Sequence, residues 1–269
     1  MRPTPYDDLN QIAAAVLERL HAVLGTNLGG LYLFGSAAVG AFETGVSDVD
    51  VLSVTIDALS DAEFGSLSAM HDALARDYPA WDDRIETKYL SAAGLRAFRS
   101  VPARMAAISP GEPFAWEEAG PGRVMVWYDV QENGITLFGP APSAFIPQIS
   151  EAEFVDCVRK HLNEWPQWLE ELPRRTGSQS YAVLTMCRAI YACRSGKQLS
   201  KRQAGLWVQQ QLPQWTDLIQ TALDWRLNSS GPVQRDAGER ELASVKAFVA
   251  FAGRATAVPG AIVCGEGGG

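Results

Sequence analysis

The hydrophobic pattern of the first half of the chain alternates between helical and strand-like spacing. Apolar residues recur every three or four positions near the start and predict an amphipathic helix that ends at Gly25: Leu9, Ile12, Val16, Leu20 and Val23. A capping box formed by Ser60 and Glu63 predicts a second helix that reaches about Tyr78. The strands expected around these helices are Leu31–Phe34, Val49–Thr55 and Arg84–Leu90.

The pattern then weakens before the middle of the chain. Residues 99–123 contain several Pro and Gly residues with little periodicity, so we expect a loop on the substrate side of the protein. The apolar run Val124–Val130 fits either a helix or a strand. The segment Gly139–Pro142 breaks the pattern again and marks the expected domain boundary.

Helical spacing dominates the second half. Ser150 and Glu153 are placed to cap a helix in which Pro166 is expected to cause a kink or a restart. Further helices are expected at about 178–195, 200–212, 215–227 and 240–255. We therefore predict an α+β protein with an N-terminal mixed-sheet domain with helices, residues 1–146, followed by an all-α helical bundle domain, residues 147–269.

Composition supports two globular domains. The chain has 269 residues, of which 47% are hydrophobic, and no apolar run is long enough to span a bilayer or to act as a secretory signal. We therefore expect a cytoplasmic protein that does not act at a membrane. The spacing of the cysteines and histidines fits neither a metal site nor a disulfide framework: Cys157, Cys187, Cys193, Cys264, His21, His71 and His161.

The net charge of −8 is unevenly distributed. Residues 1–140 carry 9 Lys and Arg against 19 Asp and Glu, whereas residues 141–269 carry 14 against 12. An acidic surface repels nucleic-acid backbones and attracts cationic small molecules. The charge thus favours a small cationic partner over a nucleic acid, although surplus acidic residues also serve solubility.

The most informative motif joins the first two strands. Gly35 and Ser36 follow the first strand, where a small residue and the start of a helix let a phosphate approach backbone N–H groups. Asp48 and Asp50 are two residues apart in the second strand, so their carboxylates share one face and supply hard oxygen ligands for Mg²⁺. This combination predicts nucleotidyl transfer from a nucleoside triphosphate.

Such a transfer needs a third carboxylate, either to complete the metal site or to take the proton of the attacking hydroxyl. Glu86 fits, since it lies in the third strand and shares its polar face with Arg84 and Lys88. Asp82 and Asp83 are competing carboxylates, but their Trp-Asp-Asp setting is typical of a solvated turn. We predict that Glu86 is the general base.

These segments resemble the nucleotidyltransferase signature of the polymerase β superfamily, and nearly the whole chain resembles aminoglycoside adenylyltransferases of the streptomycin and spectinomycin type. The matching segments are Tyr32–Ala37, Ser47–Leu52, Ile85–Leu90, Ile135–Pro140, Val183–Arg188 and Gly196–Lys201. The resemblance implies a helical domain that closes over ATP and the antibiotic. It also implies that Ser47 contributes to nucleotide binding, that Lys201 reaches the phosphates, and that Glu86 is the catalytic carboxylate.

The chain departs from the family pattern where the antibiotic is recognised. Family members carry acidic residues just before the helix that begins here near Ser178, but this chain has Thr176–Ser180 without a carboxylate. Pro113 replaces the tryptophan of a family loop, and we expect Trp116 to supply the aromatic wall instead. Trp168 lies near the position of the family's antibiotic-binding tryptophan. The predicted substrate residues are therefore Trp116, Trp168 and Ser178.

The sequence thus predicts an O-nucleotidyltransferase that transfers AMP from ATP to a hydroxyl of an aminoglycoside or aminocyclitol and depends on Mg²⁺. The expected assembly is a monomer with a small-molecule substrate and no nucleic acid. Two alternatives stay open: the same chemistry on a protein or RNA acceptor, as in toxin-like nucleotidyltransferases, and a decayed fold that only binds a ligand or partner. The three carboxylates argue against decay.

Overall fold

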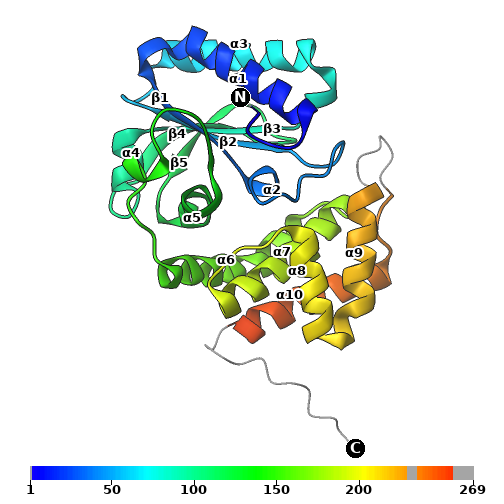
Figure 1. The fold of residues 1–269 in the computed structure, drawn as a ribbon. Helices are drawn as coiled ribbons and strands as arrows, with labels where there is room; N and C mark the ends of the chain where they lie inside the picture. Colours follow the sequence, from blue (N-terminus) through cyan, green and yellow to red (C-terminus); the bar gives the residue numbers. More distant parts are fainter. Residues whose placement is uncertain (1, 229–234, 257–269) are drawn as a thin grey trace, which may run out of the picture. The chain divides into compact units, whose positions relative to one another are not determined.

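The structure is a computed structural model in which residues 2–228 and 235–256 are described (Figure 1). Cys264 and the glycine-rich tail lie outside the described residues. The chain divides into two compact units, with the division between Ile149 and Ser150. The sequence placed a domain boundary three residues earlier, after residue 146.

A single mixed sheet organises the first unit. Among the described residues, six strands follow one another in the order β5-β4-β3-β2-β1-β6. Only the β2–β3 pair is parallel, and the other neighbours are antiparallel. The strands are β1 Leu28–Phe34, β2 Val49–Thr55, β3 Ile85–Ser91, β4 Ala103–Ile108, β5 Ala115–Ala119 and β6 Ile135–Phe138. The expected mixed-sheet domain of an α+β protein is confirmed.

Helices cover both faces of this sheet (Figure 1). Helices α1 (Asp7–Leu24) and α3 (Asp61–Asp77) lie on one face, and α2 (Gly35–Ala38), α4 (Ala92–Ala97) and α5 (Val124–Asn133) lie on the other. Short 3₁₀ turns join several elements: Gly25–Asn27, Pro79–Trp81, Pro121–Arg123 and Pro142–Ala144. Each face of the sheet therefore packs against its own set of helices. Successive side chains of a strand point to opposite faces, so alternate residues pack against different helices.

Local sequence signals explain where the first helices begin and end. Both hydrogen bonds of the capping box between Ser60 and Glu63 are present at the start of α3. Helix α1 ends at Gly25, whose φ of 52° places it in a region that glycine tolerates.

The expectation of a loop over residues 99–123 was wrong, because β4 and β5 lie within this segment. Strand β4 reads Ala-Arg-Met-Ala-Ala-Ile, and its alanines weaken the alternation that marks a strand. Antiparallel pairing of Ala106 with Tyr89 on β3 brings it into the sheet. Pairing with β3 therefore stabilises a strand that the local sequence pattern does not indicate.

The second unit is helical throughout its regular elements. They are α6 Glu151–Glu171, α7 Thr176–Ser195, α8 Lys201–Gln211, the 3₁₀ turn Pro213–Trp215, α9 Thr216–Asn228 and α10 Glu239–Thr256. Helix α6 continues through Pro166 and does not restart there. Ser200 and Gln203 form a capping box, and Gly196 ends α7 with a φ of 69°. None of the helices in the described part of the chain has the length and apolar character that a membrane span requires.

A buried histidine lies in the apolar layer between α3 and the sheet. His71 Nε2 is 2.8 Å from the Tyr89 hydroxyl, and both side chains are almost fully buried. Burial disfavours the imidazolium and lowers the pKa of His71 from 6.5 to about 4, although the charge of Asp72 opposes this shift. The histidine is therefore neutral in the folded protein near neutral pH.

This pKa predicts an acid-sensitive core. The unfolded chain takes up a proton at His71 near pH 6.5 and the folded chain only near pH 4, so stability is complete above pH 6.5 and declines below it. The decline should amount to about 3 kcal/mol by pH 4. Urea unfolding of His71→Gln between pH 7 and 4 should lack this part of the decline. The exposed His21→Gln variant is the control and should follow the wild type.

Candidate active site

The turn after β1 is shaped by a close contact with β2. Gly35 has a φ of 66°, which L side chains rarely adopt. A Cβ at this position would lie 2.1 Å from Asp50 Oδ2, so the carboxylate sits directly against the glycine Cα. Phe34 pairs with Asp50 across the two strands, which brings the turn and the carboxylate to the same end of the sheet. Glycine is therefore required here for both backbone and space.

The parallel pairing of β2 and β3 places the predicted base next to this turn. Asp50 is the register partner of Glu86, so the two side chains project from one face of neighbouring strands, which are about 4.8 Å apart. The Glu86 side chain keeps 25% of its surface exposed. Two of the three predicted carboxylates are thus cross-strand neighbours, and Glu86 is open to an incoming molecule.

A buried lysine holds the Glu86 carboxylate. Lys88 Nζ forms an ion pair with Glu86 Oε1, and the Lys88 side chain is only 5% exposed. The sequence indicated that the two residues share a face, but it gave Lys88 no role. The structure shows that they are partners.

Asp129 also contacts the turn at Gly35, although the sequence pattern assigned it no role. It belongs to α5, is 7% exposed, and its Oδ2 accepts a hydrogen bond of 3.2 Å from the Gly35 backbone N–H. Its Oδ1 accepts a second bond of 2.8 Å from Asn133 Nδ2. The one signal in the sequence was a carboxylate inside the apolar run Val124–Val130. Asp129 therefore ties α5 to the turn that carries Gly35.

The remaining predicted residues of the motif have distinct environments. Ser36 is half-buried in α2, which is a single turn rather than the longer helix that the sequence suggested, so a helix dipole contributes little at this position. The Ser47 side chain is buried, and its Oγ accepts a 3.0 Å hydrogen bond from the Glu43 N–H. Asp48 is half-buried and immediately precedes β2. Ser47 thus organises the loop before Asp48.

The donor chemistry of the site fits a magnesium ion. Carboxylate oxygens are the ligands that Mg²⁺ prefers, and Asp50 and Glu86 are register neighbours with Asp48 two residues before Asp50. Within residues 2–228 and 235–256, however, no three His, Cys, Asp or Glu side chains converge tightly enough to hold a metal ion. The carboxylate oxygens are therefore of the type that binds Mg²⁺. The pairing of β2 and β3 brings Asp50 and Glu86 together.

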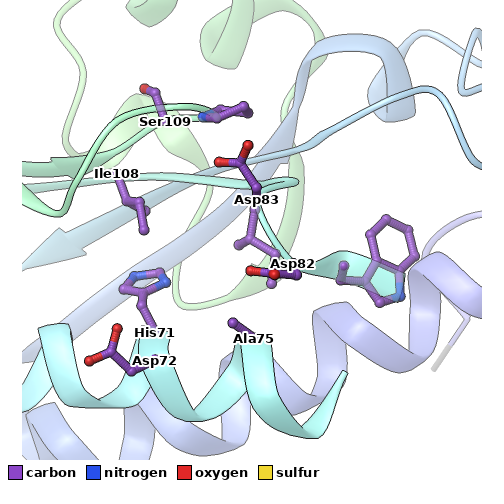
Figure 2. A pocket seen from close by; sticks show the side chains of 10 residues that line it. His71, Asp72, Ala75, Asp82, Asp83, Ile108 and Ser109 are labelled. Carbon is purple, nitrogen blue, oxygen red and sulfur yellow. The ribbon is translucent and has the colours of Figure 1, made fainter. Parts of the chain in front are cut away.

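The competing carboxylates lie at a different place. Asp82 and Asp83 line a pocket of about 140 Å³ together with His71 and Asp72 (Figure 2). Asp83 Oδ1 accepts a 2.6 Å hydrogen bond from the Gly111 N–H, which fixes the neighbouring loop. His71 belongs to α3, so this pocket opens on the α3 side of the sheet, away from the face of Glu86. The preference for Glu86 over these two residues is consistent with that separation.

Trp116 does not join the predicted site. It lies on β5, pairs with Ala106, and stacks on Phe64 of α3 with ring centroids 4.4 Å apart. The Arg104 guanidinium covers the ring at 3.6 Å. Asp50 and Glu86 project from the opposite face of the sheet. The expectation that Trp116 forms an aromatic wall for the substrate was therefore wrong, because its position in β5 directs the side chain to the α3 face of the sheet.

The predicted residues of the helical unit have local partners of their own. Lys201 begins α8, and its ammonium lies 4.8 Å from the centre of the Tyr181 ring. Trp168 on α6 is 42% exposed and contacts the rings of His161 and Trp165. Ser178 is half-buried near the start of α7. Trp168 thus presents an accessible aromatic surface.

Comparison with known proteins identifies a matching family and similar solved structures. Residues 144–253 match the family described as the C-terminal domain of aminoglycoside adenylyltransferases. The fold is similar to the crystal structure of spectinomycin adenyltransferase AAD(9) from Enterococcus faecialis with ATP and spectinomycin. The TM-score is 0.70 with 17% identity, over 91% of this chain and 97% of that chain. No curated protein sequence matches the chain.

Proposed function

We propose that this chain is an aminoglycoside adenylyltransferase, which transfers AMP from ATP to a hydroxyl of an aminoglycoside or aminocyclitol antibiotic and releases pyrophosphate. The match of residues 144–253 to the C-terminal domain of that family supports the proposal. The observation that carries the proposal is the pairing of Asp50 with Glu86 beside the Gly35 turn. This pairing places Asp50, a carboxylate suited to binding a metal–nucleotide complex, beside Glu86, the partly exposed proposed base. The resulting modification would confer resistance to the antibiotic.

Each residue of the proposed site has a defined task. Glu86 takes the proton of the acceptor hydroxyl while the oxygen of that hydroxyl bonds to the α-phosphorus. The bond between the α-phosphorus and the pyrophosphate oxygen breaks at the same time. The Gly35 turn with Ser36 receives the phosphates, and Lys201 in the helical unit is proposed as a further phosphate contact. Asp48 and Asp50, with Glu86, would hold Mg²⁺. When bound, Mg²⁺ neutralises charge on the triphosphate and stabilises the leaving pyrophosphate.

An aminocyclitol is the first acceptor to test. The neighbouring AAD(9) structure contains ATP and spectinomycin, and that pairing supports the choice. We retain Trp168 and Ser178 as the proposed antibiotic-binding residues, since Trp168 exposes an aromatic face on the helical unit. The proposed enzyme works as a cytoplasmic monomer on this small molecule, without nucleic acid.

A pyrophosphate-release screen tests the proposal directly. The purified protein would be supplied with Mg²⁺ and either ATP or GTP, against a panel of aminoglycosides, spectinomycin and lincosamides. Release that requires both ATP and one of the aminoglycosides or spectinomycin supports the proposal, and mass spectrometry of the product should show one added AMP. Labelled ATP that marks protein or RNA instead would favour the macromolecular acceptor.

Substitution of Asp50 by Asn should weaken binding of Mg-ATP by about tenfold or more, since a neutral amide is a poorer ligand for a divalent cation. Isothermal titration calorimetry with and without Mg²⁺ measures the change. Asp83→Asn, on the α3 side of the sheet, is the matched control and should bind Mg-ATP normally. Normal affinity in Asp50→Asn would remove Asp50 from the metal site.

A further inference from the structure

Lys88 occupies an environment that does not suit an ammonium group. Its register partners are Leu52 on β2 and Ala107 on β4, and Leu90 follows on the same face of β3. Each of these neighbours is 2% exposed or less. Moving a lysine into such surroundings carries a large desolvation penalty, and an apolar side chain of similar length would fill the same space without it. Stability alone therefore does not explain a lysine here.

What the lysine provides is a fixed partner for Glu86. The ammonium contacts Glu86 Oε1, and the carboxylate retains its exposed portion for other contacts. A glutamate side chain in a strand has several rotamers, and one held by a charged hydrogen bond loses that freedom before the substrate arrives. Misplacement of a reacting group by about 1 Å costs on the order of a hundredfold in rate. The pair thus supplies orientation where orientation matters most.

We propose that Lys88 is a positioning residue, which holds the Glu86 carboxylate beside Asp50 so that it meets the acceptor hydroxyl. The proposal rests on the proposed function of Glu86 as the general base. Lys88 acts through Glu86 and needs no contact of its own with ATP or the antibiotic. Its loss should therefore lower kcat without weakening nucleotide binding.

The main experiment replaces Lys88 by methionine and measures both rate and stability. Lys88→Met should lower kcat by about tenfold to a hundredfold, leave the KM for Mg-ATP within about twofold, and keep or raise the Tm because an apolar side chain suits the site. A residue with a merely structural role would show a lower Tm instead. The control is Lys246→Met, which breaks the exposed Lys246–Glu170 ion pair of the helical unit and should change neither rate nor KM.

A double variant separates action through Glu86 from direct action. In Glu86→Gln, the further change Lys88→Met should leave the residual rate unaltered and should raise the Tm by removing an uncompensated buried charge. A further tenfold loss of rate in the double variant would mean that Lys88 acts on the substrates directly. That result, or a wild-type rate in Lys88→Met, would overturn the proposal.

A readout that is independent of activity distinguishes this proposal from the proposed function. In protein labelled with ¹⁵N-lysine, the buried Lys88 ammonium should give a slowly exchanging NMR signal, assigned through its loss in Lys88→Met or its loss in Lys88→Arg if the methionine variant fails to fold. This signal should shift or vanish in Glu86→Gln. An unchanged signal would refute the pairing, whereas wild-type protein that releases no pyrophosphate with any acceptor would refute only the function.

Discussion

Substitution of Glu86 by glutamine should lower kcat by about 10²- to 10⁴-fold while Mg-ATP still binds. An amide cannot accept the proton of the acceptor hydroxyl, and general base catalysis is typically worth a factor of this size. Asp48, Asp50 and the Gly35 turn are left in place, and the glutamine keeps one oxygen that can contact Mg²⁺, so the nucleotide keeps most of its contacts. Single-turnover rates together with calorimetric titration of Mg-ATP would separate the loss of chemistry from any loss of binding.

The same substitution should also reduce stability. Removal of the Glu86 charge leaves the almost fully buried Lys88 ammonium without this partner, and breaking a buried pair from one side is destabilising. Because Glu86 is one-quarter exposed, water can replace part of the interaction, and we expect a loss of about 1–3 kcal/mol. Urea unfolding measures it.

Glu117→Gln is the matched control for both measurements. Glu117 is 26% exposed and pairs with Arg123, so the chemical change and the degree of exposure are alike, but Glu117 lies on the edge strand β5. Its variant should keep the wild-type rate. Turnover by Glu86→Gln at the level of Glu117→Gln would show that another group is the base.

Substitution of Gly35 by alanine is expected to have the second largest effect. The added Cβ would meet Asp50 Oδ2 at 2.1 Å, so the carboxylate or the turn must move. A positive φ adds backbone strain of about 1–2 kcal/mol for a residue with a side chain. Displacement of Asp50 and of the phosphate-binding turn should lower kcat/KM at least about a hundredfold. Steady-state kinetics and thermal unfolding would report the two consequences.

Gly40 provides a control with a similar positive φ but open space around its Cα. Its φ is 68°, and nothing lies within 4 Å of the Cβ that alanine would add. Gly40→Ala should therefore show the strain without the collision, with a modest loss of stability and nearly normal turnover. If the two alanine variants were equally active, the close approach of Asp50 to Gly35 would have no role in the reaction.

The sequence predicted the parts of the fold that depend on short-range signals. Capping residues such as Ser60 and Ser200, and the glycine at position 196, act on backbone groups within a few residues of themselves. The Gly-Ser and Asp-x-Asp motifs were likewise identified from residues that are close together in the sequence. Strands β4 and β5 were not predicted because they are stabilised by pairing of β4 with β3 and of β5 with β4. Such pairing is not visible in a short stretch of sequence.

The sequence by itself determined which residue types are available for the chemistry, together with the strands and turns that carry them. The tertiary structure decided which of these meet. Strand register set Asp50 beside Glu86 and turned Trp116 to the other face, because a side chain's side of the sheet depends on pairing between distant segments. Packing of α5 brought Asp129 to Gly35, and burial of Lys88 paired it with Glu86. Contacts between residues far apart in sequence exist only once the sheet and its covering helices have formed.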